Sequence, residues 1–305
     1  MFDVSVILPN YNHGHFLADC LKAIFSQSAP PREVLVIDDG SKDNSLEILE
    51  GLKNIYPRMK ILPNKKNKGI HESVNRGIFA AESEYLAFCS ADDFVFPGFF
   101  ERCKEAFALY PDAGICFGDY ATFRTGESHK EYRMMKTSGF LYVRPEMLID
   151  LIKNRQFAIN SYVAVCRRDL SRKFGGYKKN VTCLADVFFC YQIAFENPIV
   201  YVPHIFASQR IEPETYSQKI RRNFKKRSDA WANFLKESIE SENKDFMKNV
   251  IGSRLLGIGG YFILVFLLTN PRYLPLLPSV LLNVLARKFT SFFRNRFFGS
   301  KKGNV

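Results

Sequence analysis

An alternation of short apolar runs and helix-length segments constrains this chain more than any other feature, and it continues through the first 120 residues. Each apolar run has strand length and is followed by a polar turn and then by a helical segment. Strands are predicted at 3–9, 33–37, 58–62, from 84 and at 113–119, and helices at 15–27, up to 54, at 70–81 and at 97–110. This alternation predicts an α/β fold with a mostly parallel sheet and right-handed crossovers.

Two adjacent carboxylates, Asp92 and Asp93, follow the fourth apolar run. One interpretation is a site for a divalent cation and phosphate, because Mg²⁺ and Mn²⁺ prefer carboxylate oxygens and are often shared with substrate phosphates. The other is a loop in which an Asp caps the next helix. A second pair, Asp38 and Asp39, ends the second strand. Since ligands collect at the carboxyl ends of parallel strands, we expect both pairs at one edge of the sheet.

After residue 120 the pattern becomes irregular, and a hairpin or mobile loop is expected at 120–144. Regular elements are predicted again as helices at 145–154 and 184–194 and strands at 160–166 and 199–202, followed by a loop at 204–217. Asp186 lies in the first turn of the second of these helices. A carboxylate there has a purely structural explanation, because negative charge is favourable at a helix N-terminus.

The composition changes after residue 245, beyond which the chain contains no acidic residue. The apolar run at 255–268 is too short to cross a hydrocarbon core of about 30 Å at about 1.5 Å per residue, and prolines separate it from a second run at 280–286. Basic and aromatic residues then interleave at 287–298. This pattern predicts helices that lie in the interface of an anionic membrane. A helical lid and a contact between copies of the chain are the alternatives, and the leucine-rich runs argue against nucleic acid.

The net charge of +12 indicates a negatively charged partner, but the sign alone does not separate nucleic acid, anionic lipid and phosphorylated substrates. The seven cysteines include no C-x-x-C pair, so we expect buried thiols in a reducing compartment rather than a zinc site. The start of the chain lacks the basic and apolar regions of a secretion signal. We therefore expect a cytoplasmic protein.

Four short motifs, taken in order, resemble those of the family-2 glycosyltransferases of the GT-A fold. The motifs are Val4-Ser5-Val6-Ile7-Leu8-Pro9-Asn10-Tyr11-Asn12, Val36-Ile37-Asp38-Asp39-Gly40-Ser41, Asn67-Lys68-Gly69 with Asn75, and Ala91-Asp92-Asp93. The resemblance covers about residues 1 to 210. It implies an inverting enzyme that moves a sugar from a nucleotide-sugar to an acceptor hydroxyl, usually with Mn²⁺ or Mg²⁺.

The resemblance also implies which residues hold the donor. Asp39 matches the family's ligand for the nucleotide base, with Asp38 beside it, and a carboxylate can accept hydrogen bonds from a base N–H. The other implied nucleotide-sugar positions are Pro9, Tyr11, Asn12, Asn67, Gly69, Asn75, Ala91, Asp93 and Arg210. For Asn12, turn chemistry is an equal alternative to ligand contact.

The same match implies a metal ligand at Asp92 and a catalytic base at Asp186. Ser90 stands where many relatives carry an Asp, so the ion should rely on Asp92 and the donor diphosphate. The base would take a proton from the acceptor hydroxyl as it attacks the anomeric carbon. Ala185 stands where the family usually has Glu. Arg210, with His204 and Gln209 near it, matches the family's loop that approaches the diphosphate. The planar guanidinium of an arginine can donate two hydrogen bonds to a phosphate group.

We therefore expect a GT-A domain at 1–215, a basic polar helical linker at 216–250 and an apolar, basic, membrane-associated extension at 251–305. The expected donor is a UDP- or dTDP-sugar, and the expected acceptor is a glycan or lipid-linked molecule in bacterial surface-glycan synthesis. The expected location is the inner face of the cell membrane, with a homo-oligomer as an option. The alternatives are a GT-A-like nucleotidyltransferase and a non-catalytic scaffold that binds sugar nucleotides or membranes.

Overall fold

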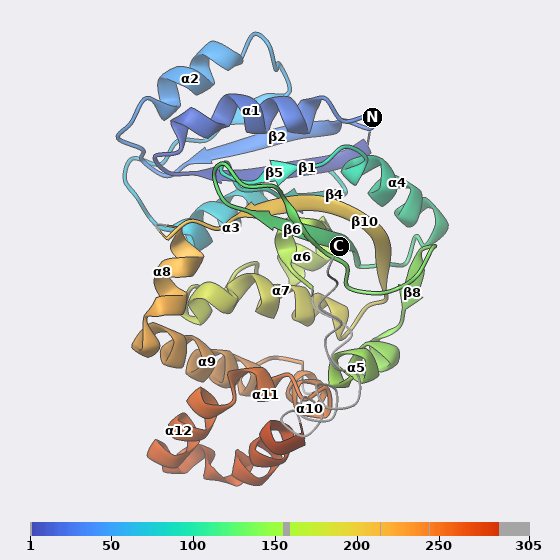
Figure 1. Ribbon diagram of the computed structural model, residues 1–305, viewed down its shortest axis with the longest axis vertical. Helices are drawn as coiled ribbons and strands as arrows, with labels where there is room; N and C mark the ends of the chain where they lie inside the picture. The colour runs from blue at the N-terminus through green and yellow to red at the C-terminus, as the bar shows by residue number, and fades with distance from the viewer. Residues whose placement is uncertain (1, 155–158, 214, 244, 287–305) are drawn as a thin grey trace.

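A computed structural model describes residues 2–154, 159–213, 215–243 and 245–286, and a ten-stranded sheet forms its centre (Figure 1). The strands are β1 Phe2–Asn10, β2 Pro31–Asp38, β3 Met59–Ile61, β4 Tyr85–Phe88, β5 Phe94–Val95, β6 Ile115–Phe123, β7 Lys130–Tyr132, β8 Leu141–Val143, β9 Ala164–Arg167 and β10 Ile199–Arg210. Their order is β3-β2-β1-β4-β9-β6-β10-β5, with β7 beside β6 and β8 beside β10.

The predicted mostly parallel α/β sheet is confirmed, with one antiparallel strand inside it. β1, β2, β3, β4, β6 and β10 all point the same way. β9 runs against both of its neighbours, β4 and β6. The predicted 120–144 region contains β7, which forms a hairpin with β6, and β8, which pairs with β10.

Helices cover both faces of the sheet. The first six are α1 Gly14–Phe25, α2 Ser45–Leu52, α3 Ile70–Ala80, α4 Phe99–Leu109, α5 Pro145–Lys153 and α6 Arg168–Lys173. They are followed by the 3₁₀ segment η2 Lys179–Leu184 and by α7 Ala185–Ala194, while the 3₁₀ turn η1 Ser161–Val163 precedes β9. Along β1, Val6 and Leu8 pack with α1, α2 and α4, whereas Ile7 packs with α3 and α7. A strand buried on both faces explains why 3–9 reads as a continuous apolar run.

The chain between 204 and 210 is a strand, so the expected loop at 204–217 is wrong over these residues. β10 pairs with β6 up to the Arg210–Phe123 register, and β5 pairs with its other edge. These partners lie more than 80 residues earlier in the chain, so local sequence could not reveal them. The extension carries Gln209 and Arg210 to the edge of the sheet where the acidic pairs lie.

The C-terminal helices pack directly on the α7 side of the sheet (Figure 1). They are α8 Tyr216–Arg222, α9 Phe224–Ile239, α10 Phe246–Gly252, α11 Leu256–Gly259, α12 Tyr261–Thr269, the 3₁₀ segment η3 Pro271–Leu276 and a helix at 277–286. Trp231, Phe234 and Leu235 of α9 are buried in the same core as Phe188 of α7. The stretch expected to be a linker therefore contributes a packed helix. None of the described helices is both long enough and apolar enough to cross a membrane.

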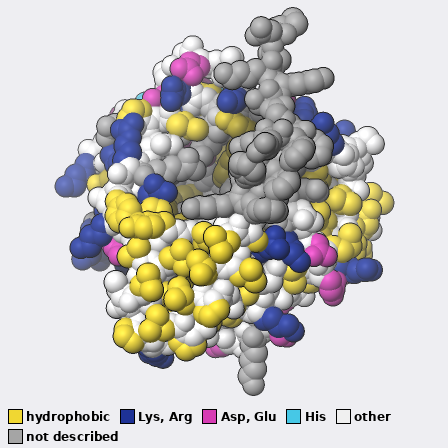
Figure 2. Space-filling view, turned by 60° about the horizontal axis from the view of Figure 1, so that its bottom comes forward, with side chains coloured by type: hydrophobic (Ala, Val, Ile, Leu, Met, Phe, Trp, Pro, Cys, Tyr) yellow, Lys and Arg dark blue, Asp and Glu magenta, His cyan; other side chains and the backbone are white. Residues whose placement is uncertain are grey.

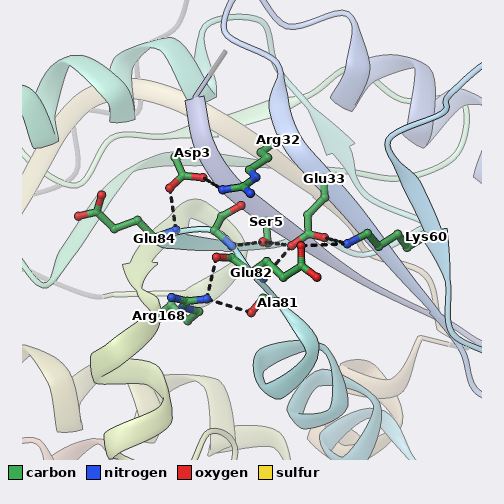
Figure 3. A network of polar contacts seen from close by, with 10 residues as sticks. Asp3, Ser5, Arg32, Glu33, Lys60, Ala81, Glu82, Glu84 and Arg168 are labelled. Atoms are coloured by element: carbon green, nitrogen blue, oxygen red, sulfur yellow. Dashed lines mark hydrogen bonds and ion pairs between the residues drawn. The ribbon is translucent and has the colours of Figure 1, made fainter.

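A polar network braces the amino ends of β1 and β2, at the opposite end of the strands from Asp38 (Figure 3). Its centre is Glu33, which accepts hydrogen bonds from the Ser5 hydroxyl at 2.5 Å and from the Glu82 N–H at 2.9 Å. Lys60 Nζ lies 2.8 Å from the other Glu33 oxygen. Burial alone would raise the pKa of Glu33, but these three partners together hold that pKa below its ordinary value of 4.5.

We expect Glu33→Gln to lower the free energy of unfolding at neutral pH by about 1–3 kcal/mol, because the amide loses the ion pair and one charged acceptor. A carboxyl with a lowered pKa in the folded state stabilises above pH 4.5, and this stabilisation is lost as the pH falls through the folded value. Thermal unfolding of both proteins across this range should show the difference shrinking in acid. A difference that persists unchanged in acid would contradict this assignment. Glu50→Gln, which removes an exposed ion pair with Lys53, is the control and should have little effect.

Candidate active site

A cavity of about 250 Å³ opens at the carboxyl ends of β1 and β4, beside the start of α7. Its walls come from distant parts of the chain. Five side chains that the sequence predicted for the site line it, namely Pro9, Asp92, Asp93, Asp186 and Arg210. Gln209 also lines the cavity. The structure thus brings one of the two acidic pairs and the predicted base to a single hollow.

Asp186 lies in the first turn of α7, directly after η2. Burial raises the pKa of Asp186 to about 6, although the N–H groups of Asp186 and Val187 partly oppose this shift. The Asp186 side chain is partly exposed and faces the cavity, whose lining also includes Phe88, Tyr162 and Tyr177. A carboxylate with a pKa near 6 is ionised at neutral pH and readily accepts a proton, as a general base requires.

Tyr177 lines the same cavity as this carboxylate. Burial first, and the charge of Asp186 second, raise the pKa of the Tyr177 phenol well above its ordinary value. Its hydroxyl donates to Ser161 Oγ at 2.7 Å. Asn75 holds the Tyr177 backbone, because its side chain donates to the carbonyl at 2.9 Å and accepts from the N–H at 2.7 Å. Asn75, predicted as a ligand position, thus supports the wall in this structure.

The turn between β4 and β5 carries Asp92 and Asp93, and Arg210 holds it in place. The Arg210 N–H donates to Asp93 Oδ1 at 2.9 Å, and its Nε donates to the Asp92 carbonyl at 3.0 Å. The guanidinium lies 4.4 Å and 4.5 Å from the ring centres of Phe16 and Phe123. Burial and the charge of Asp92 raise the pKa of Asp93 well above its ordinary value, against the smaller effect of Arg210. Arg210 therefore connects the end of β10 to the acidic turn.

The acidic turn fits a hard divalent cation. Asp92 faces the cavity, and one of its oxygens already accepts a hydrogen bond from the Ser90 hydroxyl. Over the described ranges, no cluster of three or more His, Cys, Asp or Glu side chains could hold a metal by itself. One or two carboxylates completed by substrate phosphates is the usual arrangement for Mg²⁺. The residues of the acidic turn can therefore bind such a cation only together with phosphate oxygens of the donor.

Asp39 does not line the cavity, and its carboxylate braces a loop. Its Oδ1 accepts from Asn64 Nδ2 at 2.7 Å and from the Lys68 N–H at 2.9 Å, while Oδ2 accepts from the Gly69 N–H at 2.8 Å. Only 3% of Asp39 is exposed. Because a carboxylate has about four acceptor positions, one remains on Oδ2. Contact of Asp39 with a nucleotide base stays a prediction that depends on this one position.

The other predicted donor positions lie around the loops at this edge rather than in the cavity wall. Asp38 is fully buried and accepts from Asn10 Nδ2 at 2.8 Å and from the Ser41 hydroxyl at 2.6 Å. Asn12 adopts a left-handed φ of 56° and accepts from the Lys42 N–H at 2.7 Å, which supports its turn-forming alternative. Tyr11 and Asn67 are exposed, Gly69 precedes α3, and Ala91 is buried. His204 lies elsewhere, because its Nε2 contacts the Pro97 carbonyl at 2.9 Å.

Sequence reasoning missed several parts of the cavity wall, above all His71 and Thr182. Thr182 has φ 52° and ψ −121°, a strained conformation for a β-branched residue. Its carbonyl accepts a hydrogen bond from His71 Nε2 at 2.9 Å, and both residues line the cavity. No glycine or motif marks this position in the sequence, and the contact joins residues 111 apart. This strained residue lies four positions before the predicted base Asp186, and backbone strain of this kind is typical of functional sites.

The sheet order and the carboxylates at its carboxyl edge are typical of α/β proteins that bind nucleotides. The family model described as "Glycosyl transferase family 2" matches residues 5–174. The chain belongs to this family.

Curated relatives agree with the family assignment. An uncharacterized glycosyltransferase of Escherichia coli (strain K12), YibD, is 32% identical over 171 residues, which cover 55% of this chain and 49% of that protein. Glycosyltransferase GlyG of Streptococcus pneumoniae serotype 4 is 29% identical over 153 residues, which cover 50% of each protein. The matches thus span about half the length of these relatives.

Solved structures confirm the GT-A fold over nearly the whole chain. Staphylococcus aureus TarS (residues 1–349) in complex with UDP-GlcNAc superposes with a TM-score of 0.60 at 16% identity, covering 98% of this chain and 93% of that one. The mannosyltransferase PcManGT of Pyrobaculum calidifontis, in complex with GDP-Man and Mn²⁺, gives 0.58 at 15% identity, covering 98% and 88%. At 15–16% sequence identity, these superpositions establish a shared fold and nothing about the ligands of this chain.

Proposed function

We propose that this protein transfers a sugar from a nucleotide-diphosphate sugar to an acceptor hydroxyl with inversion at the anomeric carbon. The acceptor oxygen attacks the anomeric carbon from the face opposite the diphosphate. Asp186 takes the hydroxyl proton while the bond between the anomeric carbon and the diphosphate oxygen breaks, and the diphosphate leaves with the electron pair. A single displacement of this kind inverts the configuration.

The observation that carries this proposal is the presence of Asp186 and Asp92 in one cavity. The two carboxylates have different surroundings, which suits two different tasks. The pKa of Asp186 is raised to about 6 by burial, whereas Asp92 lies in a polar turn beside Asp93 and Arg210. Two carboxylates whose surroundings differ in this way can take different roles, one as a general base and the other as a cation ligand.

Asp92, next to Asp93 in the same turn, would hold Mn²⁺ or Mg²⁺ together with the donor diphosphate. When bound, such a cation neutralises the negative charge of the departing diphosphate. Arg210 keeps the acidic turn in position through its hydrogen bond to the Asp92 carbonyl. The family membership leaves the nucleotidyltransferase alternative without support.

The finer identity of the substrates is also proposed. A UDP- or dTDP-sugar is the favoured donor, and a solved TarS complex with UDP-GlcNAc supports a uridine nucleotide on this fold. A glycan or lipid-linked acceptor at the inner face of the cell membrane, in surface-polysaccharide synthesis, completes the proposal. Matches to a chondroitin synthase and a hyaluronan synthase of Pasteurella multocida, each 32% identical over 104 residues, support a glycan product.

A panel of UDP-, dTDP- and GDP-sugars tests the proposed function. With Mn²⁺ or Mg²⁺ present, we expect slow donor hydrolysis and calorimetric binding for UDP- or dTDP-sugars. The released nucleoside diphosphate is the readout, and blanks without the enzyme give the background. Binding without turnover in the presence of cell-extracted acceptors would favour the non-catalytic scaffold, and exclusive use of GDP-sugars would overturn the nucleotide preference.

A further inference from the structure

The C-terminal helices carry a set of large apolar side chains that point away from the rest of the protein. They are Ile258, Tyr261, Leu268, Leu274, Leu281, Leu282 and Leu285, which we call the outer face. Tyr261, Leu268 and Leu282 are 65%, 64% and 69% exposed. Figure 2 shows hydrophobic side chains gathered on the face of the molecule that the C-terminal helices form, with Lys and Arg and a few acidic side chains at the margins. A contiguous apolar surface of this kind marks an interaction site.

The outer face is not needed to pack these helices on the protein. The opposite side of the same helices supplies Leu256, Ile263, Leu267, Val280 and Val284 to the core that also contains Trp231. α12 is apolar on nearly every side, from Tyr261 to Leu268. A helix that is apolar all round is normally covered on all sides. In the described part of the chain, the inner side packs on the core. The outer face is largely exposed, and Tyr261 contacts the exposed ring of Phe224, with the ring centres 6.2 Å apart.

The charge of the chain beyond residue 245 selects the partner. Beyond Asp245 the chain has no acidic residue, whereas it has Lys248, Arg254, Arg272, Arg287, Lys288, Arg294, Arg296, Lys301 and Lys302. Arg227 and Lys236 of α9 lie over the Phe262 and Phe266 rings of α12, at 4.7 Å and 5.3 Å. A second copy would bring the same cations against this cationic surface, which is unfavourable. A surface of negative headgroups over an apolar interior complements both features.

We infer that the outer face docks on an anionic lipid bilayer, with its leucines in the acyl boundary and the cations of the C-terminal part of the chain at the headgroups. The 19 residues that follow residue 286 in the sequence include six Lys or Arg and no acid. They also contain Phe289, Phe292, Phe293, Phe297 and Phe298. Basic and aromatic residues next to an apolar helical face are typical of interfacial attachment. The inference does not depend on glycosyl transfer, because attachment needs neither donor nor acceptor.

Flotation of the full chain with lipid vesicles tests the inference. We expect the protein to float with vesicles of phosphatidylcholine and phosphatidylglycerol, and to float severalfold less with phosphatidylcholine alone or in high salt. The triple variant Leu268→Ser, Leu282→Ser, Leu285→Ser should lose at least about tenfold in vesicle affinity. The matched control is Ile55→Ser, Leu109→Ser, Phe79→Ser, whose side chains are exposed to a similar degree on the catalytic domain. It should bind as the wild type does.

Several results would overturn the inference. Unchanged flotation of the triple variant, with an unchanged thermal unfolding curve, would show that the outer face does not bind lipid. A wild-type dimer in light scattering without vesicles that dissociates in the triple variant would make this face a contact between copies. Flotation that appears only after residues 287–305 are removed would mean that this segment covers the face. Donor hydrolysis should be the same in the triple variant and the wild type, so attachment and catalysis fail separately.

Discussion

Asp186→Asn is expected to lower kcat by about 10²- to 10⁴-fold, the usual cost of losing a general base. Donor binding should persist, because the change leaves Asp92 and Arg210 in place. The folded protein should be as stable or more stable above pH 6, since the buried Asp186 charge is lost. The sign follows from the raised pKa: an Asp whose folded pKa is about 6 costs stability as the pH rises from its ordinary value towards 6.

The pH profile provides a second readout of the same residue. In the wild type, kcat/KM should fall as the pH drops through about 6, because Asp186 must be deprotonated to accept the hydroxyl proton. This acid limb should be missing from the residual activity of Asp186→Asn. Asp169→Asn is the matched control, because Asp169 occupies the first turn of α6 without lining the cavity. Near-wild-type turnover of Asp186→Asn would show that Asp186 is not the general base. Its role would then be to place a favourable negative charge at the N-terminus of α7.

Asp92→Ala is expected to lose metal-dependent donor affinity. Donor affinity in the presence of the ion should fall at least about 10- to 100-fold. Removing only a residue that hydrogen-bonds to a metal ligand already has an effect of this size. Calorimetry with a UDP-sugar, with and without Mn²⁺, measures it. The wild type should bind much more tightly with the ion, and the variant should bind equally weakly with and without it.

The control for Asp92→Ala is Asp229→Ala, an exposed position on α9. It removes the same charge from the chain without touching the acidic turn. If Asp92→Ala keeps the full effect of Mn²⁺ on donor binding, the ion is held elsewhere and the acidic turn serves only as a cap for the next element.

Local sequence predicted the part of the sheet in which strands that are close in the sequence pair with each other. The apolar runs at 3–9 and 33–37 correspond to β1 and β2, which pair with each other, and β3 and β4 extend the same block. β9 and the far half of β10 could not be placed in this way. Their orientation depends on partners more than 45 residues away, such as Ile115 for Cys166 and Phe123 for Arg210.

For the site, motifs identified the charged residues and missed the residues that shape the cavity around them. Asp92 and Asp186 were predicted from patterns that can be read along the chain, and both line the cavity. His71 and Thr182 become meaningful only through a contact across the fold. Asp39 illustrates the opposite limit, since its motif implies a ligand but its oxygens are largely used by Asn64, Lys68 and Gly69.

α9 lies between the segment that leads to Asp186 and the helices of the outer face. On one side it packs on η2, where Asn233 Nδ2 donates to the Asn180 carbonyl at 2.8 Å, and on the other it packs on α12. If the outer face rests on a bilayer, this layer of helices sets the height of the cavity above the lipid headgroups. The helical layer would thus separate the site of sugar transfer from the lipid surface.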